Sequence, residues 1–184
     1  MAFLLTDTKK SAILKKMKTY PDFYKKHTAF IKDRKKAKKC LIILDKIATF
    51  ALALLGATGG VLTLFGLFGA YLPTLFSLAL PVALAFGIAT MIRYAAPRER
   101  PYAQGTDVIC DREKDSPSFP SRHTTCAFAI AVSLCATTLW LGVPALVLGA
   151  CLAYIRFLCG YHYPADLIWG GIIGSGLGAL AFLF

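Results

Sequence analysis

The sequence has few acidic side chains and, over long stretches, no charge of either sign. Its 184 residues include 10 Asp and Glu against 21 Lys and Arg, and no carboxylate cluster is spaced to hold a metal ion. The six cysteines contain no Cys-x-x-Cys pair, which argues against a structural zinc site. The first forty residues also lack the apolar core of a signal peptide, so we expect the first apolar segment to be an uncleaved anchor.

Charge is absent from three long segments, which are Ile47–Ile92, Thr124–Ile155 and Leu167–Phe184. Hydrophobic residues make up 57% of the chain, and the mean hydropathy is +0.59. At roughly 20 residues for each crossing, these segments supply about five transmembrane helices, with breaks expected at Gly69–Pro73 and Gly142–Pro144. The sequence therefore predicts an all-α integral membrane bundle that crosses the cell membrane several times.

The basic excess lies at the N-terminus, where the first 46 residues hold 14 Lys and Arg against 4 Asp and Glu. A stripe of Ile13, Met17, Tyr20 and Tyr24 beside these lysines predicts an interfacial amphipathic helix. We expect residues 1–40 to contact anionic lipid headgroups and not nucleic acid. Residues 41–184 would form the membrane domain, with an active-site loop at 95–120.

Polar side chains interrupt the apolar segments in three clusters, Arg93–Tyr102, Pro120–His123 and Arg156–Asp166. Five crossings put all three clusters on the same side of the membrane. Ionisable residues at such positions are costly, and they usually carry function.

These clusters hold the groups needed to bind and cleave a phosphate ester. Several arginines beside a helix N-terminus predict an anion site, because guanidinium groups match phosphate oxygens and the first N–H groups of a helix lack partners within it. Of two histidines in one site, one can attack phosphorus while the other protonates the leaving oxygen. Asp166 follows His162 by four residues and can orient its imidazole. No cofactor or metal is expected, so the arginines would neutralise the developing charge.

The order and spacing of the clusters resemble the signature of the type 2 phosphatidic acid phosphatase superfamily, which includes lipid phosphate phosphatases. That signature reads Lys-x6-Arg-Pro, Pro-Ser-Gly-His and Ser-Arg-x5-His-x3-Asp. The matching residues here are Arg93-x6-Arg100-Pro101, Pro120-Ser121-Arg122-His123 and Arg156-x5-His162-x3-Asp166.

The resemblance implies a catalytic role for each of three residues. His162 would be the nucleophile that forms a phosphohistidine, Asp166 would orient it, and His123 would be the general acid. The residues implied to bind the substrate phosphate are Arg93, Arg100, Ser121, Arg122 and Arg156.

Three positions depart from the signature. Arg93 stands where the family has Lys, Arg122 where it often has Gly, and Ile155 where it often has Ser. Arg93 keeps the charge but not the shape of Lys. Arg122 can offer its backbone N–H, and its side chain can add a phosphate contact or narrow the entrance. Ile155 removes one possible hydroxyl contact.

The predicted activity is hydrolysis of a lipid phosphomonoester or diphosphate, with phosphatidic acid, phosphatidylglycerol phosphate and undecaprenyl diphosphate as candidates. The alternative is a membrane transporter or lipid-binding protein that holds an anion without chemistry. The Lys and Arg bias places the site in the cytoplasm, whereas the resemblance favours the extracytoplasmic side, which we adopt.

Two structural questions stay open in the sequence. Cys40 and Cys110 lie outside the apolar segments and are either bridged or free. Gly170, Gly174 and Gly178 predict close helix packing, either within one chain or across a dimer, so the oligomeric state is undecided.

Overall fold

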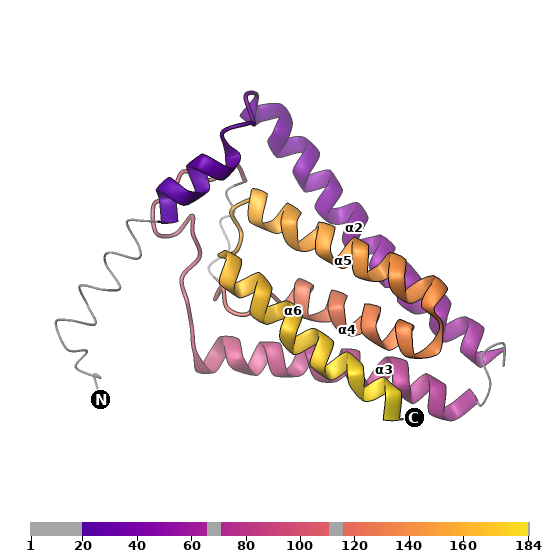
Figure 1. Ribbon diagram of the computed structural model, residues 1–184. Helices are drawn as coiled ribbons and strands as arrows, with labels where there is room; N and C mark the ends of the chain where they lie inside the picture. Colours follow the sequence, from indigo (N-terminus) through magenta and orange to yellow (C-terminus); the bar gives the residue numbers. More distant parts are fainter. Residues whose placement is uncertain (1–19, 66–70, 111–115, 184) are drawn as a thin grey trace, which may run out of the picture.

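A computed structural model describes residues 20–65, 71–110 and 116–183 of the protein, and that part contains helices and no strand (Figure 1). A short helical segment at residues 20–28 precedes the bundle. The labelled helices are α2 (Arg34–Leu64), α3 (Tyr71–Ala95), α4 (Arg122–Thr137), α5 (Leu139–Leu158) and α6 (Pro164–Gly178), and α6 continues into the 3-10 turn η1 (Ala179–Leu183).

Four of these helices are long and apolar enough to cross a membrane: α2, α3, α5, and α6 together with η1. The fifth, α4, has only 16 residues, which is shorter than the roughly 20 needed to span the hydrocarbon core. It lies at the centre of the bundle and contacts all four of the others. Apolar side chains such as Phe50, Met91 and Trp140 point outward at 70–90% exposure, as expected for a lipid-facing surface. The predicted all-α membrane bundle is confirmed.

Helix α6 packs closely against α4 because glycines line the contact. A Cβ at Gly174 would lie 2.2 Å from the carbonyl oxygen of Thr125, and one at Gly178 would lie 2.8 Å from that of Ala129. The glycine row therefore packs within the monomer. This packing brings the N-terminal end of α6 beside the N-terminal end of α4, where the Ser121 N–H donates to the Asp166 carbonyl at 3.1 Å.

The turn between α4 and α5 is at Thr138, so the break predicted at Gly142–Pro144 is wrong. Thr138 is extended (φ −159°, ψ 126°), and both Gly142 and Pro144 lie inside α5. Gly142 is needed for packing, since a Cβ there would lie 2.4 Å from the Cys135 sulfur.

The N-terminal region also differs from the expectation. Helix α2 begins at Arg34, where Asp33 caps it by accepting the Lys36 N–H at 3.0 Å, so the expected boundary at residue 40 falls inside a helix. Tyr24 is 1% exposed, and the Tyr20 ring centroid lies 4.6 Å from that of Tyr163, so these two residues of the predicted stripe contact protein. The other two, Ile13 and Met17, lie outside the described residues.

One end of the bundle gathers the C-terminal ends of α3 and α5 and the N-terminal ends of α4 and α6 (Figure 1). The loop between α3 and α4 and the segment 20–28 lie at this same end. The three polar clusters are thus brought together, as the sequence predicts.

Candidate active site

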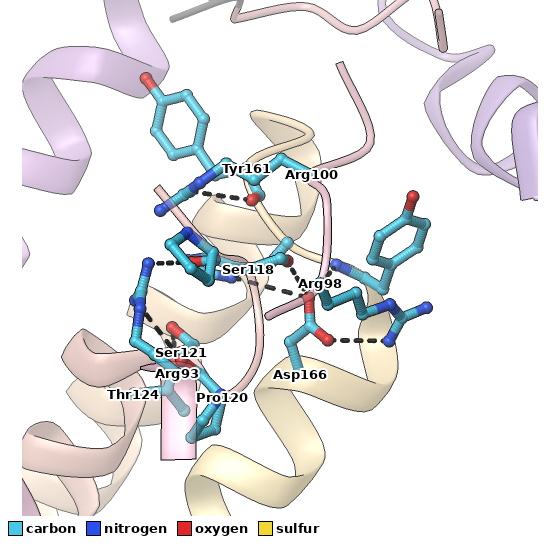
Figure 2. A network of polar contacts seen from close by, with 12 residues as sticks. Arg93, Arg98, Arg100, Ser118, Pro120, Ser121, Thr124, Tyr161 and Asp166 are labelled. Carbon is cyan, nitrogen blue, oxygen red and sulfur yellow. Dashed lines mark hydrogen bonds and ion pairs between the residues drawn. The ribbon is translucent and has the colours of Figure 1, made fainter. Parts of the chain in front are cut away.

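The site is built where the ends of α3, α4 and α6 meet the long loop (Figure 2). Arg93 lies in the last turn of α3, Ser121 precedes α4, and His162 lies in the turn before α6. Residues from three separate parts of the sequence therefore surround one polar centre.

His162 is almost completely buried at 1% exposure, and its Nδ1 faces two oxygen-bearing side chains. Ser118 Oγ lies 3.5 Å from Nδ1, and the nearer Asp166 oxygen, Oδ2, lies 3.7 Å from it. Ser118 also donates a hydrogen bond to Asp166 Oδ2. Asp166 is therefore linked to the imidazole chiefly through the Ser118 hydroxyl, and Nε2 on the other side of the ring is the nitrogen left for chemistry.

Asp166 is itself held by contacts from three directions (Figure 2). Its Oδ1 accepts from Arg98 Nη1 at 2.9 Å, and its Oδ2 accepts from the Tyr163 backbone N–H at 3.0 Å as well as from Ser118. The bond to Tyr163 caps the first turn of α6, which begins with Pro164. The carboxylate, which is fully buried, therefore has a single well-defined position.

Burial determines the charge of His162. Loss of solvation is the largest effect, and together with the nearby positive charges of Arg100 and Arg156 it lowers the pKa of His162 to about 4, although Asp166 opposes the shift. The imidazole is therefore neutral at pH 7, which is the state a nitrogen nucleophile requires.

Arg93 and Arg100 organise the end of the loop. Arg100 donates from Nε to the Ser116 carbonyl at 2.9 Å and from Nη1 to the Tyr161 carbonyl at 3.0 Å, and so ties the loop to the His162 turn. Arg93 donates to the carbonyls of Pro117 and Pro120. Both guanidinium groups thus hold the end of the loop, and Arg100 lies near enough to His162 to influence its imidazole.

The start of α4 carries the other half of the predicted site. Ser121 is fully buried and accepts a hydrogen bond from Thr124 Oγ1 at 3.0 Å, whereas His123 is exposed on the first turn. The Arg122 guanidinium lies 5.5 Å from the centre of the Phe86 ring and close enough to Arg93 to repel it electrostatically. Three cations therefore surround the N-terminus of α4, which itself favours anions.

Arg156 occupies a different position from the other arginines. It is 3% exposed and forms an ion pair with Asp45 of α2, with Nη2 to Oδ1 at 2.9 Å and to Oδ2 at 3.0 Å. Arg156 thus connects α2 to α5 and adds positive charge near His162. Its expected role in gripping phosphate stays a prediction.

Two hollows adjoin these residues. A polar cavity of about 600 Å³ is lined by loop residues that include Arg98, Arg100 and Ser116. An apolar groove of about 640 Å³ lies between α2, α3 and α4, and its lining includes Gly60, Leu78 and Phe86. Phe86 is the residue beneath Arg122, so the apolar groove reaches the polar site.

Sequence reasoning missed Ser118, Arg98 and Asp45. Ser118 lies just before the Pro-Ser-Arg-His motif, and only its complete burial beside Asp166 shows its importance. An arginine in a polar loop is typical of a solvated charge, yet Arg98 pairs with Asp166 and its guanidinium lies 3.9 Å from the Tyr163 ring centre. A single acidic residue near the start of an apolar segment was the available signal for Asp45.

Known proteins resemble this chain in sequence and in fold. The family described as the PAP2 superfamily matches residues 70–184. The putative undecaprenyl-diphosphatase YbjG of Escherichia coli is 30% identical over 105 residues, which cover 56% of this chain and 52% of that protein. The undecaprenyl-diphosphatase BcrC of Bacillus subtilis is 34% identical over 67 residues, which cover 36% of this chain and 35% of that protein. The chain thus matches about half, or less, of the length of these curated relatives.

The fold also matches a solved structure, the transmembrane PAP2-type phosphatidylglycerolphosphate phosphatase from Bacillus subtilis. The TM-score is 0.61 at 19% identity, and the match covers 89% of this chain and 83% of that one. At this identity the likeness shows a shared fold.

Proposed function

The chain belongs to the PAP2 superfamily, and we propose that it is a membrane phosphatase that hydrolyses the phosphate of a lipid through a phosphohistidine intermediate. The observation that carries the proposal is the buried, neutral His162 beside Ser118 and Asp166, next to three arginines at the N-terminus of α4.

The first chemical step would transfer the phosphoryl group to His162. Nε2 attacks phosphorus, the bond from phosphorus to the lipid oxygen breaks, and His123 gives its proton to that oxygen. The exposure of His123 at the start of α4 suits a group that must reach a departing lipid. Arg93, Arg100 and Arg122 stabilise the charge on the phosphoryl oxygens, together with the Ser121 hydroxyl and the first N–H groups of α4. Arg156, buried against Asp45, reinforces this positive field.

The second step would release phosphate. Water attacks the phosphohistidine, His123 takes the water's proton, and the bond between phosphorus and Nε2 breaks to restore neutral His162. Asp166, through Ser118, keeps the ring in one orientation during both steps. In this scheme the arginines provide the charge neutralisation, and activity is expected to persist in EDTA.

The apolar groove supplies a place for the lipid tail. It runs between transmembrane helices and reaches Phe86 under the Arg122 guanidinium, so a tail lying there would deliver its phosphate to the arginines. The relatives YbjG and BcrC are both named for undecaprenyl diphosphate, a polyprenyl lipid. We therefore place a polyprenyl diphosphate first among candidate substrates, before phosphatidylglycerol phosphate and phosphatidic acid. The site would face the extracytoplasmic side, and the basic N-terminal residues would contact anionic headgroups.

The test is phosphate release by the full chain in detergent micelles containing EDTA and one of these three lipids. We expect turnover with at least one lipid, loss of turnover in His162→Gln, and unchanged turnover in His27→Gln. His27 is the matched control because it is the third histidine of the chain, is exposed, and has its Nδ1 2.8 Å from the Phe23 carbonyl of its own helical segment. Saturable lipid binding without phosphate release would instead support the transporter or binding protein.

A further inference from the structure

The loop segment 106–110 lies directly against the turn 157–161 that leads into His162, and we call this contact the seam. The Cys110 N–H donates to the Cys159 carbonyl at 3.1 Å across it. The next residue, Gly160, has a φ of 74°, and a Cβ there would lie 2.4 Å from Val108 Cγ1. Only glycine allows the two segments to approach so closely.

Tyr24 fastens the seam from the N-terminal segment. Its hydroxyl accepts the Ile109 N–H at 3.2 Å and donates to the Leu158 carbonyl at 2.6 Å. One buried side chain therefore bridges both sides of the seam, immediately next to Cys110 and Cys159. Its position restricts how far these two residues can separate.

Cys110 and Cys159 are both fully buried in the same apolar cluster as Tyr24. A backbone hydrogen bond between two residues places their Cα atoms on the order of 5–6 Å apart, which is within the range of disulfide-bonded cysteines. The neighbouring Cys110 thiol and burial both raise the pKa of the Cys159 thiol. The partner that the fold gives to Cys110 is therefore Cys159, since Cys40 is exposed on α2.

We propose that Cys110 and Cys159 form a disulfide in the membrane-inserted protein and thereby join the active-site loop covalently to the His162 turn. The two thiols give up two electrons and two protons to a small or enzymatic disulfide oxidant, which leaves as two thiols, and one bond forms between the two sulfurs. This requires the site to face an oxidising compartment, as the extracytoplasmic placement supplies.

The bond would restrict the movement of the catalytic turn. Cys159 precedes His162 by three residues, and the loop beyond Cys110 leads to Ser118 and the start of α4. Joining them would keep Ser118 near the imidazole in both steps. A disulfide that closes the long loop between Cys110 and Cys159 would stabilise the fold chiefly by restricting the conformations of the unfolded chain.

The test counts thiols in the full-length protein. Cells are lysed into N-ethylmaleimide under denaturing conditions without reductant, and the alkylated protein is weighed and digested. We expect four of the six cysteines to be alkylated, with a linked peptide pair containing Cys110 and Cys159. In Cys110→Ser all five remaining cysteines should be alkylated, whereas Cys151→Ser, which removes an exposed cysteine of α5, should still show the linked pair.

Reduction provides a second readout. It should lower the apparent melting temperature of the parent by roughly 5–10 °C and leave that of Cys110→Ser unchanged. Six alkylated cysteines in the parent, or a linked pair that excludes Cys159, would overturn the inference, as would an equal shift in both proteins. These measurements need no substrate, so their failure would leave the phosphatase proposal standing.

Discussion

The two histidines of the site lie in contrasting surroundings. His162 is 1% exposed and is bordered by Ser118, Asp166 and two nearby cations, whereas His123 is exposed on the first turn of α4. Burial keeps the first imidazole neutral and positioned, and exposure lets the second meet a leaving group that must depart. The same end of the helical bundle thus provides a preorganised nucleophile, His162, and an accessible general acid, His123.

The largest effect is expected from removing the buried imidazole. His162→Gln should lower kcat by at least about 10³-fold on every substrate, because the nitrogen that attacks phosphorus is removed. Phosphate release under single-turnover conditions measures this directly. A variant with more than a tenth of the parental rate would remove His162 from the chemical step.

Removing the exposed histidine should give a loss that depends on the leaving group. His123→Gln should lower kcat by about 10²- to 10⁴-fold on a lipid phosphate, whose alkoxide must be protonated. In the first turnover of p-nitrophenyl phosphate, the rate of nitrophenolate release should fall less than about tenfold, because nitrophenolate leaves without a proton. Equal losses in this first step on both substrates would contradict proton donation by His123 to the leaving group.

Removing Asp166 or Ser118, which orient the His162 ring, should lower kcat less than removing the ring itself. Asp166→Asn is expected to lower kcat by about 10²-fold and Ser118→Ala by about tenfold, with KM little changed, because neither side chain touches the substrate. Thermal unfolding of each variant separates this effect from damage to the fold. A rise in KM with unchanged kcat would contradict a positioning role.

The smallest effect is a displacement of the pH profile. Burial lowers the pKa of His162 to about 4. We therefore expect kcat/KM to stay high as the pH falls below 6.5, the ordinary pKa of histidine, and to decrease only as the pH approaches 4. The folded pKa lies below the unfolded value, so this histidine also destabilises the fold as the pH falls from 6.5 towards 4. Arg100→Gln removes a charge that lowers this pKa, so the acid limb should move to higher pH. An acid limb at pH 6.5 in the parent would show that burial does not lower the pKa of His162.

The fold was predictable wherever local sequence determines it. The charge-free segments predicted the helices, and the spacing of Arg100, His123 and His162 predicted polar clusters at helix ends. Those helix ends meet at one end of the bundle (Figure 1). Helix ends were less predictable, since Gly142 could be assigned to packing only after Cys135 was seen against it.

The missed site residues depend on partners that are remote in the chain. Ser118 and Arg98 both bond Asp166, at separations of 48 and 68 positions, and Asp45 bonds Arg156 across 111. No local periodicity connects these pairs, and Ser118, Arg98 and Asp45 are not positions of the three-part signature. Their pairing follows from the glycine contact between α4 and α6 and from the crossing of α2 over α5.

The most direct measurement of the central claim is isolation of the phosphorylated protein. The parent and His123→Gln are mixed with a lipid substrate labelled in its reacting phosphate, quenched in alkali within one turnover, and digested. We predict a base-stable, acid-labile phosphoryl group on the peptide that contains His162, and none in His162→Gln. Label on another residue, or label that persists in His162→Gln, would contradict the account.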